Sequence, residues 1–169
     1  MHQRTRFIFT IIATVLLLAG SSATALAQQS RSGGLGLSLD DWDAIFGPGE
    51  PGQSLMSYET DGGQTMYVGQ EDGVVDSIQI NLETSESGPL SLEDAQALVE
   101  SLLPNDAELE ETFTAPVIAP GTYTITSELW ESDWLEDRYR DDDRENFNVI
   151  YQQTGLEPLV TSIAIIVED

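Results

Sequence analysis

The sequence predicts an α+β fold, in which an antiparallel sheet carries short helices packed on one face. Short strand patterns follow each of two short helical segments, an order typical of the α+β class. Glycine-containing pairs between strand patterns are typical of tight hairpins. The helical segments are too few and too short to connect parallel strands, so we expect antiparallel pairing.

A ten-residue stretch occurs twice and predicts two tandem α-β-β-β-like units. The first copy, LSLDDWDAIF, begins at Leu37, and the second, LSLEDAQALV, begins at Leu90. Five of the ten positions are identical. Each copy opens a helix and is followed by strand patterns. We therefore expect unit one at residues 37–83 and unit two at residues 90–169 of a single domain, residues 37–169.

Each helix is expected to begin at a serine. Ser38 and Ser91 are favourable N-caps, because a serine hydroxyl can accept a hydrogen bond from a free N–H of the first turn. Asp41 and Asp94, three residues later, occupy the capping-box position. Apolar residues then recur every three or four positions, which indicates one buried face on each helix.

The strand patterns are short and alternate between apolar and polar residues. Such alternation is typical of antiparallel strands with one buried face. The last pattern is apolar on both faces, so we expect it in the middle of the sheet. Two tryptophans spaced four residues apart indicate a short helix between residues 130 and 140. The expected strands cover residues 55–60, 64–69, 74–83, 108–115, 122–129, 146–153 and 159–167.

The N-terminal residues have the pattern of a secretory signal peptide. Arg4 and Arg6 precede an almost unbroken apolar run, residues 7–20, and Ala25-Leu26-Ala27 is an acceptable cleavage site. The run is shorter than the roughly 20 residues that span a bilayer, which favours cleavage over an uncleaved anchor. We therefore expect residues 1–27 to be removed. The exported protein, extracellular or in the cell envelope, would then be soluble, with residues 28–36 as a flexible lead-in.

The chain is strongly acidic. It has 30 acidic and six basic residues, and none of the basic residues is lysine. Cleavage after Ala27 would leave four basic residues and a formal charge of −26. Such a surface repels nucleic acids and anionic membranes, so neither is expected as a partner. Solubility is the simplest interpretation of this charge, and a cationic partner or bound cations is the alternative.

The residue types present exclude several kinds of catalysis. After Ala27 the chain contains no histidine, cysteine or lysine. Catalytic triads, Schiff-base chemistry and zinc sites with histidine or cysteine ligands are therefore excluded. There is no phosphate-binding or dinucleotide-binding motif, so no cofactor is expected. A carboxylate pair could still hydrolyse a glycosidic bond, but solvated surface carboxylates are the simpler interpretation, and we do not expect an enzyme.

The acidic residues between Glu131 and Glu145 could form a Ca²⁺ site, because oxygen-rich loops suit hard cations. The loop lacks the spacing of an EF-hand, however. Arg138, Arg140 and Arg144 are interleaved with the acids, which favours a local ion-pair network. No metal site is therefore expected.

Trp130, Trp134 and Tyr139 are the candidate binding residues. Aromatic residues beside arginine are typical of binding hot spots. Burial in the core is the alternative and the favoured interpretation, since large aromatic residues are buried on average. This segment has no counterpart in the first unit, so a distinctive function would lie here.

Part of the chain resembles a known repeat. A helix ends in Phe46-Gly47-Pro48 and is followed by Tyr58, by Met66-Tyr67-Val68-Gly69, and by a hairpin with Asp72-Gly73-Val74-Val75 and Ile78. This layout resembles the repeat of the small outer-membrane assembly lipoproteins, and a tandem of such units is similar to the secreted β-lactamase inhibitory proteins. The chain has no cysteine, so lipid anchoring and disulfides do not carry over.

The resemblance implies an extracytoplasmic protein-binding module, although it transfers no functional residue. We therefore expect a secreted, non-enzymatic protein-binding module. The alternatives are a carboxylate-dependent extracellular hydrolase and a Ca²⁺-stabilised surface or matrix component.

The signal-peptide pattern makes a direct prediction. The protein recovered after export should begin at Gln28, because Ala25 and Ala27 place cleavage before it. Intact-mass measurement and N-terminal sequencing of the exported protein test this expectation. A protein that retains Met1 and stays in the membrane fraction would contradict it.

Overall fold

The computed structural model describes residues 32–52, 54–60, 63–85, 88–116, 123–139, 144–154 and 159–168. The chain divides into two units, Met1–Arg31 and Ser32–Asp169, and every described residue belongs to the second. The expected signal peptide therefore lies outside the described residues, as do residues 28–31 of the lead-in.

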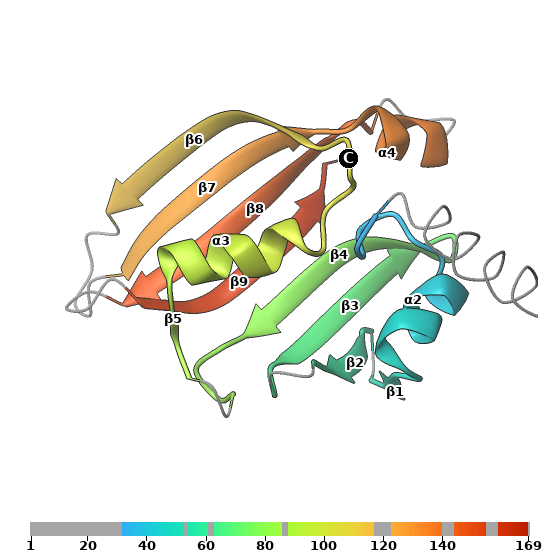
Figure 1. The fold of residues 1–169 in the computed structure, drawn as a ribbon, viewed down its shortest axis with the longest axis horizontal. Helices are drawn as coiled ribbons and strands as arrows, with labels where there is room; N and C mark the ends of the chain where they lie inside the picture. The colour runs from blue at the N-terminus through green and yellow to red at the C-terminus, as the bar shows by residue number, and fades with distance from the viewer. Residues whose placement is uncertain are drawn as a thin grey trace, which may run out of the picture. The chain divides into compact units, whose positions relative to one another are not determined.

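The described residues form one antiparallel sheet of nine strands with a few short helices (Figure 1). This confirms the α+β class. The strands are β1 (Glu50–Pro51), β2 (Met56–Glu59), β3 (Thr65–Glu71), β4 (Val74–Asn81), β5 (Leu90–Ser91), β6 (Glu108–Pro116), β7 (Tyr123–Glu131), β8 (Asn146–Thr154) and β9 (Leu159–Val167). The helices are α2 (Leu39–Phe46), α3 (Leu92–Glu100) and α4 (Asp133–Arg138).

The sheet consists of two meanders that meet at its centre. The strand order is β1-β2-β3-β4-β9-β8-β7-β6, and the short β5 pairs with β9. Strands β1 to β4 follow α2 along the chain, and β6 to β9 follow α3. The last strands of the two meanders pair with each other, Ser77–Asn81 of β4 against Ser162–Ile166 of β9. The expected central position of residues 159–167 is confirmed.

Helices α2 and α3 both begin at the serines that the sequence predicts as N-caps. The Ser38 hydroxyl accepts a hydrogen bond from the Asp41 N–H at 3.2 Å, and the Ser91 hydroxyl accepts one from the Asp94 N–H at 3.1 Å. Each hydroxyl also donates to the carboxylate of the same aspartate, at 2.7 Å and 2.6 Å. The two helix starts are therefore chemically and geometrically alike. No described helix is long and apolar enough to cross a membrane.

The core lies on one face of the sheet, and α3 crosses this face in Figure 1. Short helices are only marginally stable in isolation, so these helices depend on packing against the core. Burial of one large apolar side chain contributes about 1.5–3 kcal/mol to the free energy of folding. Fully buried residues of the sheet and helices include Met66, Val68, Ile78, Ile80, Val149, Tyr151, Ile163, Ile165, Trp42, Ala95 and Val99.

The end of the expected lead-in is packed rather than flexible. Leu35 is completely buried, and its N–H donates to the Leu102 carbonyl at 2.9 Å. The next N–H, of Gly36, donates to the Val75 carbonyl at 2.8 Å. Gly36 has a φ of +79°, and a Cβ there would lie 2.5 Å from the Trp134 ring. Residues before Leu37 therefore belong to the packed part of the chain, because Leu35 contributes to the core.

The matched helix starts predict matched losses of stability. Ser38→Ala and Ser91→Ala should each lower the free energy of unfolding by about 1 kcal/mol, because each removes the acceptor of a first-turn N–H. Urea denaturation measures both values. The exposed Ser54 provides the control, and Ser54→Ala should change the free energy by less than about 0.5 kcal/mol. Equal effects of all three substitutions would contradict the capping role.

Candidate functional site

The three candidate aromatic residues are all partly buried and pack against the core. Trp130, near the end of β7, stacks on Phe147 with ring centroids 6.3 Å apart and an interplanar angle of 13°. The guanidinium of Arg138 lies 5.6 Å from the Trp134 ring centroid. Each ring thus has neighbours within the folded unit. This placement agrees with the interpretation of these residues as packing residues.

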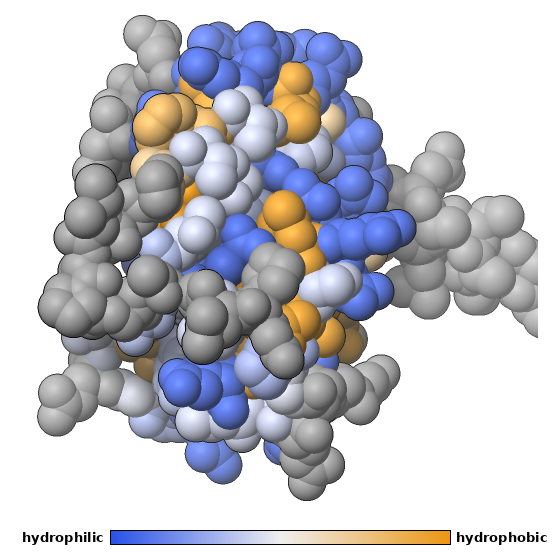
Figure 2. Space-filling model, turned by 90° about the vertical axis from the view of Figure 1, so that its left-hand side faces the viewer, coloured by the Kyte–Doolittle hydropathy of each residue, from blue (hydrophilic) through white to orange (hydrophobic). Residues whose placement is uncertain are grey.

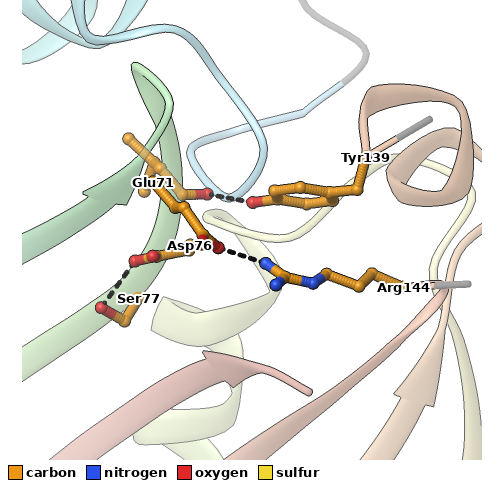
Figure 3. A network of polar contacts seen from close by, with 6 residues as sticks. Glu71, Asp76, Ser77, Tyr139 and Arg144 are labelled. Atoms are coloured by element: carbon orange, nitrogen blue, oxygen red, sulfur yellow. Dashed lines mark hydrogen bonds and ion pairs between the residues drawn. The ribbon is translucent and has the colours of Figure 1, made fainter. Parts of the chain in front are cut away.

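Tyr139 connects the end of α4 to the β3–β4 hairpin (Figure 3). Its hydroxyl donates to the Val75 carbonyl at 3.3 Å, and the Arg144 guanidinium lies 5.4 Å from its ring centroid. Burial is the main cause that raises the pKa of Tyr139, with a further contribution from the negative charge of Asp76. The phenol therefore stays neutral and acts as a hydrogen-bond donor.

The predicted local ion-pair network takes a different form in the structure. Arg144 pairs with Glu71 of β3, far away in the sequence, and Arg138 donates from Nε to the Gly36 carbonyl at 3.0 Å. These arginines reach across the fold because the segment around α4 packs against the β3–β4 hairpin. Arg140 lies outside the described residues.

A buried carboxylate lies beside Trp130 and was not singled out from the sequence. Glu128 of β7 is only 2% exposed. Its Oε1 accepts a hydrogen bond from Gln96 Nε2 of α3 at 2.6 Å. Its Oε2 accepts from Trp130 Nε1 at 3.2 Å and from the Tyr151 hydroxyl at 3.0 Å. Three neutral donors thus surround the carboxylate and join α3, β7 and β8.

The Glu128 network also affects the tyrosine that donates to it. Burial first, and then the negative charge of Glu128, raise the pKa of Tyr151. The Tyr151 hydroxyl therefore keeps its proton and its role as donor. The alternation of apolar and polar residues along the sequence could not reveal this network, because the network depends on which face of β7 meets α3.

The described acidic side chains differ in burial. Among the described residues, Glu128 is the one buried acid. A glycosidase-like reaction needs two carboxylates about 5–10 Å apart and open to substrate, whereas the oxygens of Glu128 are occupied by protein donors. In the described part of the chain, no three acidic side chains are placed to hold a metal ion. Residues 141–143 of the candidate Ca²⁺ loop lie outside it.

A depression of about 450 Å³ lies beside the end of α2 and is lined by Phe46, Tyr58, Glu50, Glu59 and neighbouring residues. The Tyr58 hydroxyl donates to Asp43 Oδ1 at 2.8 Å. Burial first, and then this hydrogen bond, raise the pKa of Tyr58 to about 12. The phenol is therefore neutral near pH 7 and cannot act there as a base.

The sheet face opposite α3 carries exposed and half-buried side chains. A row of side chains crosses six strands on this face, because paired residues lie side by side: Phe113, Ser127, Ile150, Ala164, Gln79 and Tyr67. Phe113 is 63% exposed and Tyr67 is 40% exposed. Figure 2 shows another side of the molecule, the left-hand side of Figure 1, and there hydrophobic residues occur in small groups among hydrophilic ones.

No known protein family, no curated protein and no solved structure matches the chain. The resemblance to the tandem-repeat proteins therefore stays an expectation.

The Glu128 network predicts a large effect from an isosteric substitution. Glu128→Gln should lower the free energy of unfolding by about 2–3 kcal/mol, because an amide nitrogen would replace a carboxylate oxygen that accepts hydrogen bonds in a buried site. Urea denaturation measures the loss. The control is Glu59→Gln, since Glu59 is exposed, and its effect should be below about 0.5 kcal/mol. A similar small effect at Glu128 would show that the network contributes little.

Proposed function

We propose that the protein is an exported, non-enzymatic module that binds another protein through the uncovered face of its sheet. The observation that carries this proposal is the exposure of large apolar side chains on a face that no described helix or strand covers. These side chains are Tyr67, Phe113, Tyr123 and Ile166, which are 40–63% exposed. Exposed apolar groups rimmed by polar residues are typical of interaction sites.

The chemistry of this face suits a protein partner. Apolar and aromatic side chains alternate there with the amides and hydroxyls of residues such as Gln79, Gln152 and Ser162. The same side chains, with Tyr67 and Ala164, line a shallow depression of about 260 Å³. Protein interfaces combine an apolar centre with polar groups that form hydrogen bonds, and this face offers both.

Two further observations support the other parts of the proposal. The N-terminal pattern ending at Ala27 supports export. The absence of histidine, cysteine and lysine after Ala27, together with the structural engagement of Glu128, supports a binding role over catalysis.

We also infer that the folded unit is a tandem of two related halves, α2-β1-β2-β3-β4 and α3-β6-β7-β8-β9. The sheet order β1-β2-β3-β4-β9-β8-β7-β6 supports this inference, because the two meanders have matching connectivity. Ser38 forms a bridge to Val74, the first residue of β4. Likewise, Ser91 pairs with Leu159, the first residue of β9.

Contacts between each helix and its meander match as well. Asp43 of α2 is hydrogen-bonded to Tyr58 of β2, and Gln96 of α3 is hydrogen-bonded to Glu128 of β7. Asp43 and Gln96 occupy the same position of the repeated stretch. The second strand of each meander thus bonds to the corresponding helix residue.

The binding proposal predicts that substitutions on the uncovered face abolish partner capture. Tyr67→Ser combined with Ile166→Ser should reduce recovery of the partner from the native culture medium by at least about tenfold, because two exposed apolar contacts would be lost. Pull-down with quantitative mass spectrometry measures recovery. Thermal unfolding of each variant verifies that it is folded.

The matched control is Ile45→Ser on α2. Ile45 is 51% exposed but does not lie on the sheet, so this variant should capture the partner normally. Recovery of no partner at any salt concentration, or equal losses in the face variant and the control, would overturn the proposal.

A further inference from the structure

The two edges of the sheet differ in length. One edge is β1, which has only two residues, and the other is β6, which has nine. Within the described residues, β6 pairs with β7 on one side and with no strand on the other. Alternate N–H and C=O groups of an edge strand point away from the sheet and can pair with another chain. Strand β6 is therefore the longer open edge.

Charge is distributed unevenly along β6. Glu108, Glu110 and Glu111 lie in its first half, whereas the second half, from Thr112 to Pro116, carries no charge. Within β6, Leu109 is 48% exposed and Phe113 is 63% exposed. The open edge thus combines an acidic half with a neutral half that presents an aromatic side chain.

The negative charge around the first half extends onto β7. Glu108 pairs with Glu131 in the sheet register. The pKa of the Glu131 carboxyl is raised mainly by the negative charge of Glu145, and further by burial and by Glu110 and neighbouring acids. These carboxylates repel one another, so a cationic group beside them would relieve an existing repulsion.

The same charges decide which kind of strand could occupy the edge. A second copy of this chain would bring another set of the same glutamates, and the full chain has a net charge of −24. Edge charges are a common protection against pairing with like chains. They disfavour an acidic strand and favour a basic one, because opposite charges on neighbouring strands stabilise pairing by about 0.2–1 kcal/mol per pair.

We propose that β6 binds an extended, lysine- or arginine-rich segment of a partner protein as an additional strand of the sheet. Backbone hydrogen bonds along β6 supply affinity, and alternate side chains supply specificity, as in other cases of strand addition. Basic residues of the segment lie beside Glu108, Glu110 and Glu111, and an apolar residue lies beside Phe113. This site goes beyond the proposed function because it uses the open backbone edge of β6 and its glutamates, and Phe113 is the side chain that it shares with the uncovered face.

The test measures binding of two synthetic peptides of equal charge to the whole folded protein. One peptide alternates lysine with threonine and valine, and the other alternates lysine with proline. Proline cannot donate the backbone hydrogen bonds that a strand requires. Fluorescence anisotropy gives the two Kd values at low and high salt, and NMR hydrogen exchange reports protection of the β6 amides.

We expect the strand-forming peptide to bind at least about tenfold more tightly than the proline peptide, since only the former can pair along the edge. It should also slow amide exchange at residues 112–114 and bind more weakly at high salt.

The variant E108Q/E110Q/E111Q should weaken binding at least about tenfold, whereas E50Q/E59Q/E83Q, which removes the same charge from exposed positions, should weaken it by less than about threefold. Phe113→Thr should weaken binding without unfolding β6.

Several results would overturn the proposal. Equal affinity for the two peptides, or equal effects of the two triple variants, would show non-specific attraction between opposite charges. Absence of binding at low salt would also overturn it. The variant with Tyr67→Ser and Ile166→Ser should bind the peptide normally, so failure of the edge site can be distinguished from failure of the face site.

Discussion

The pairing of β4 with β9 is the constraint on which the described fold depends. It joins the two meanders through one short ladder, from Ser77 opposite Ile166 to Asn81 opposite Ser162. Ile78 and Ile80 face the core beside Ile165 and Ile163 of the partner strand. The ladder therefore places both helices on one continuous apolar surface, and neither meander could bury its own inner face as fully alone.

The two halves of the core are packed with different kinds of side chain. Around α2, Trp42 contacts Phe46 and Tyr58 with ring centroids 4.4 Å and 5.6 Å apart. Around α3, the corresponding position is the small Ala95, and the next residue, Gln96, is hydrogen-bonded to the buried Glu128. Removing a carboxylate from water costs free energy, so a buried carboxylate adds little net stability even when its oxygens accept hydrogen bonds. Its main effect is to favour one arrangement of the core, because a shifted packing would leave it without its donors.

Local signals in the sequence predicted local structure well. Ser38 and Ser91 marked both helix starts, and Asp72-Gly73 marked a hairpin in which both residues have positive φ values, 50° and 81°. The seven longer strands lie within two residues of their expected bounds. Alternation in β7 could not reveal which face is inner, because that choice depends on the distant α3 and β8. For the same reason the burial of Glu128, the packing of Leu35 and the long-range partner of Arg144 could not be predicted.

The central position of β9 has a consequence for the order in which the core can form. Among the described strands β9 is the last along the chain, yet it completes the inner faces of both β4 and β8. Until it docks, β4 presents an open apolar edge of the kind that promotes aggregation, and long-range pairing of this type is slow. A nascent chain therefore remains incompletely buried through most of its synthesis. Such delayed closure confines assembly of the core to the time after β9, the last of the described strands, has been made.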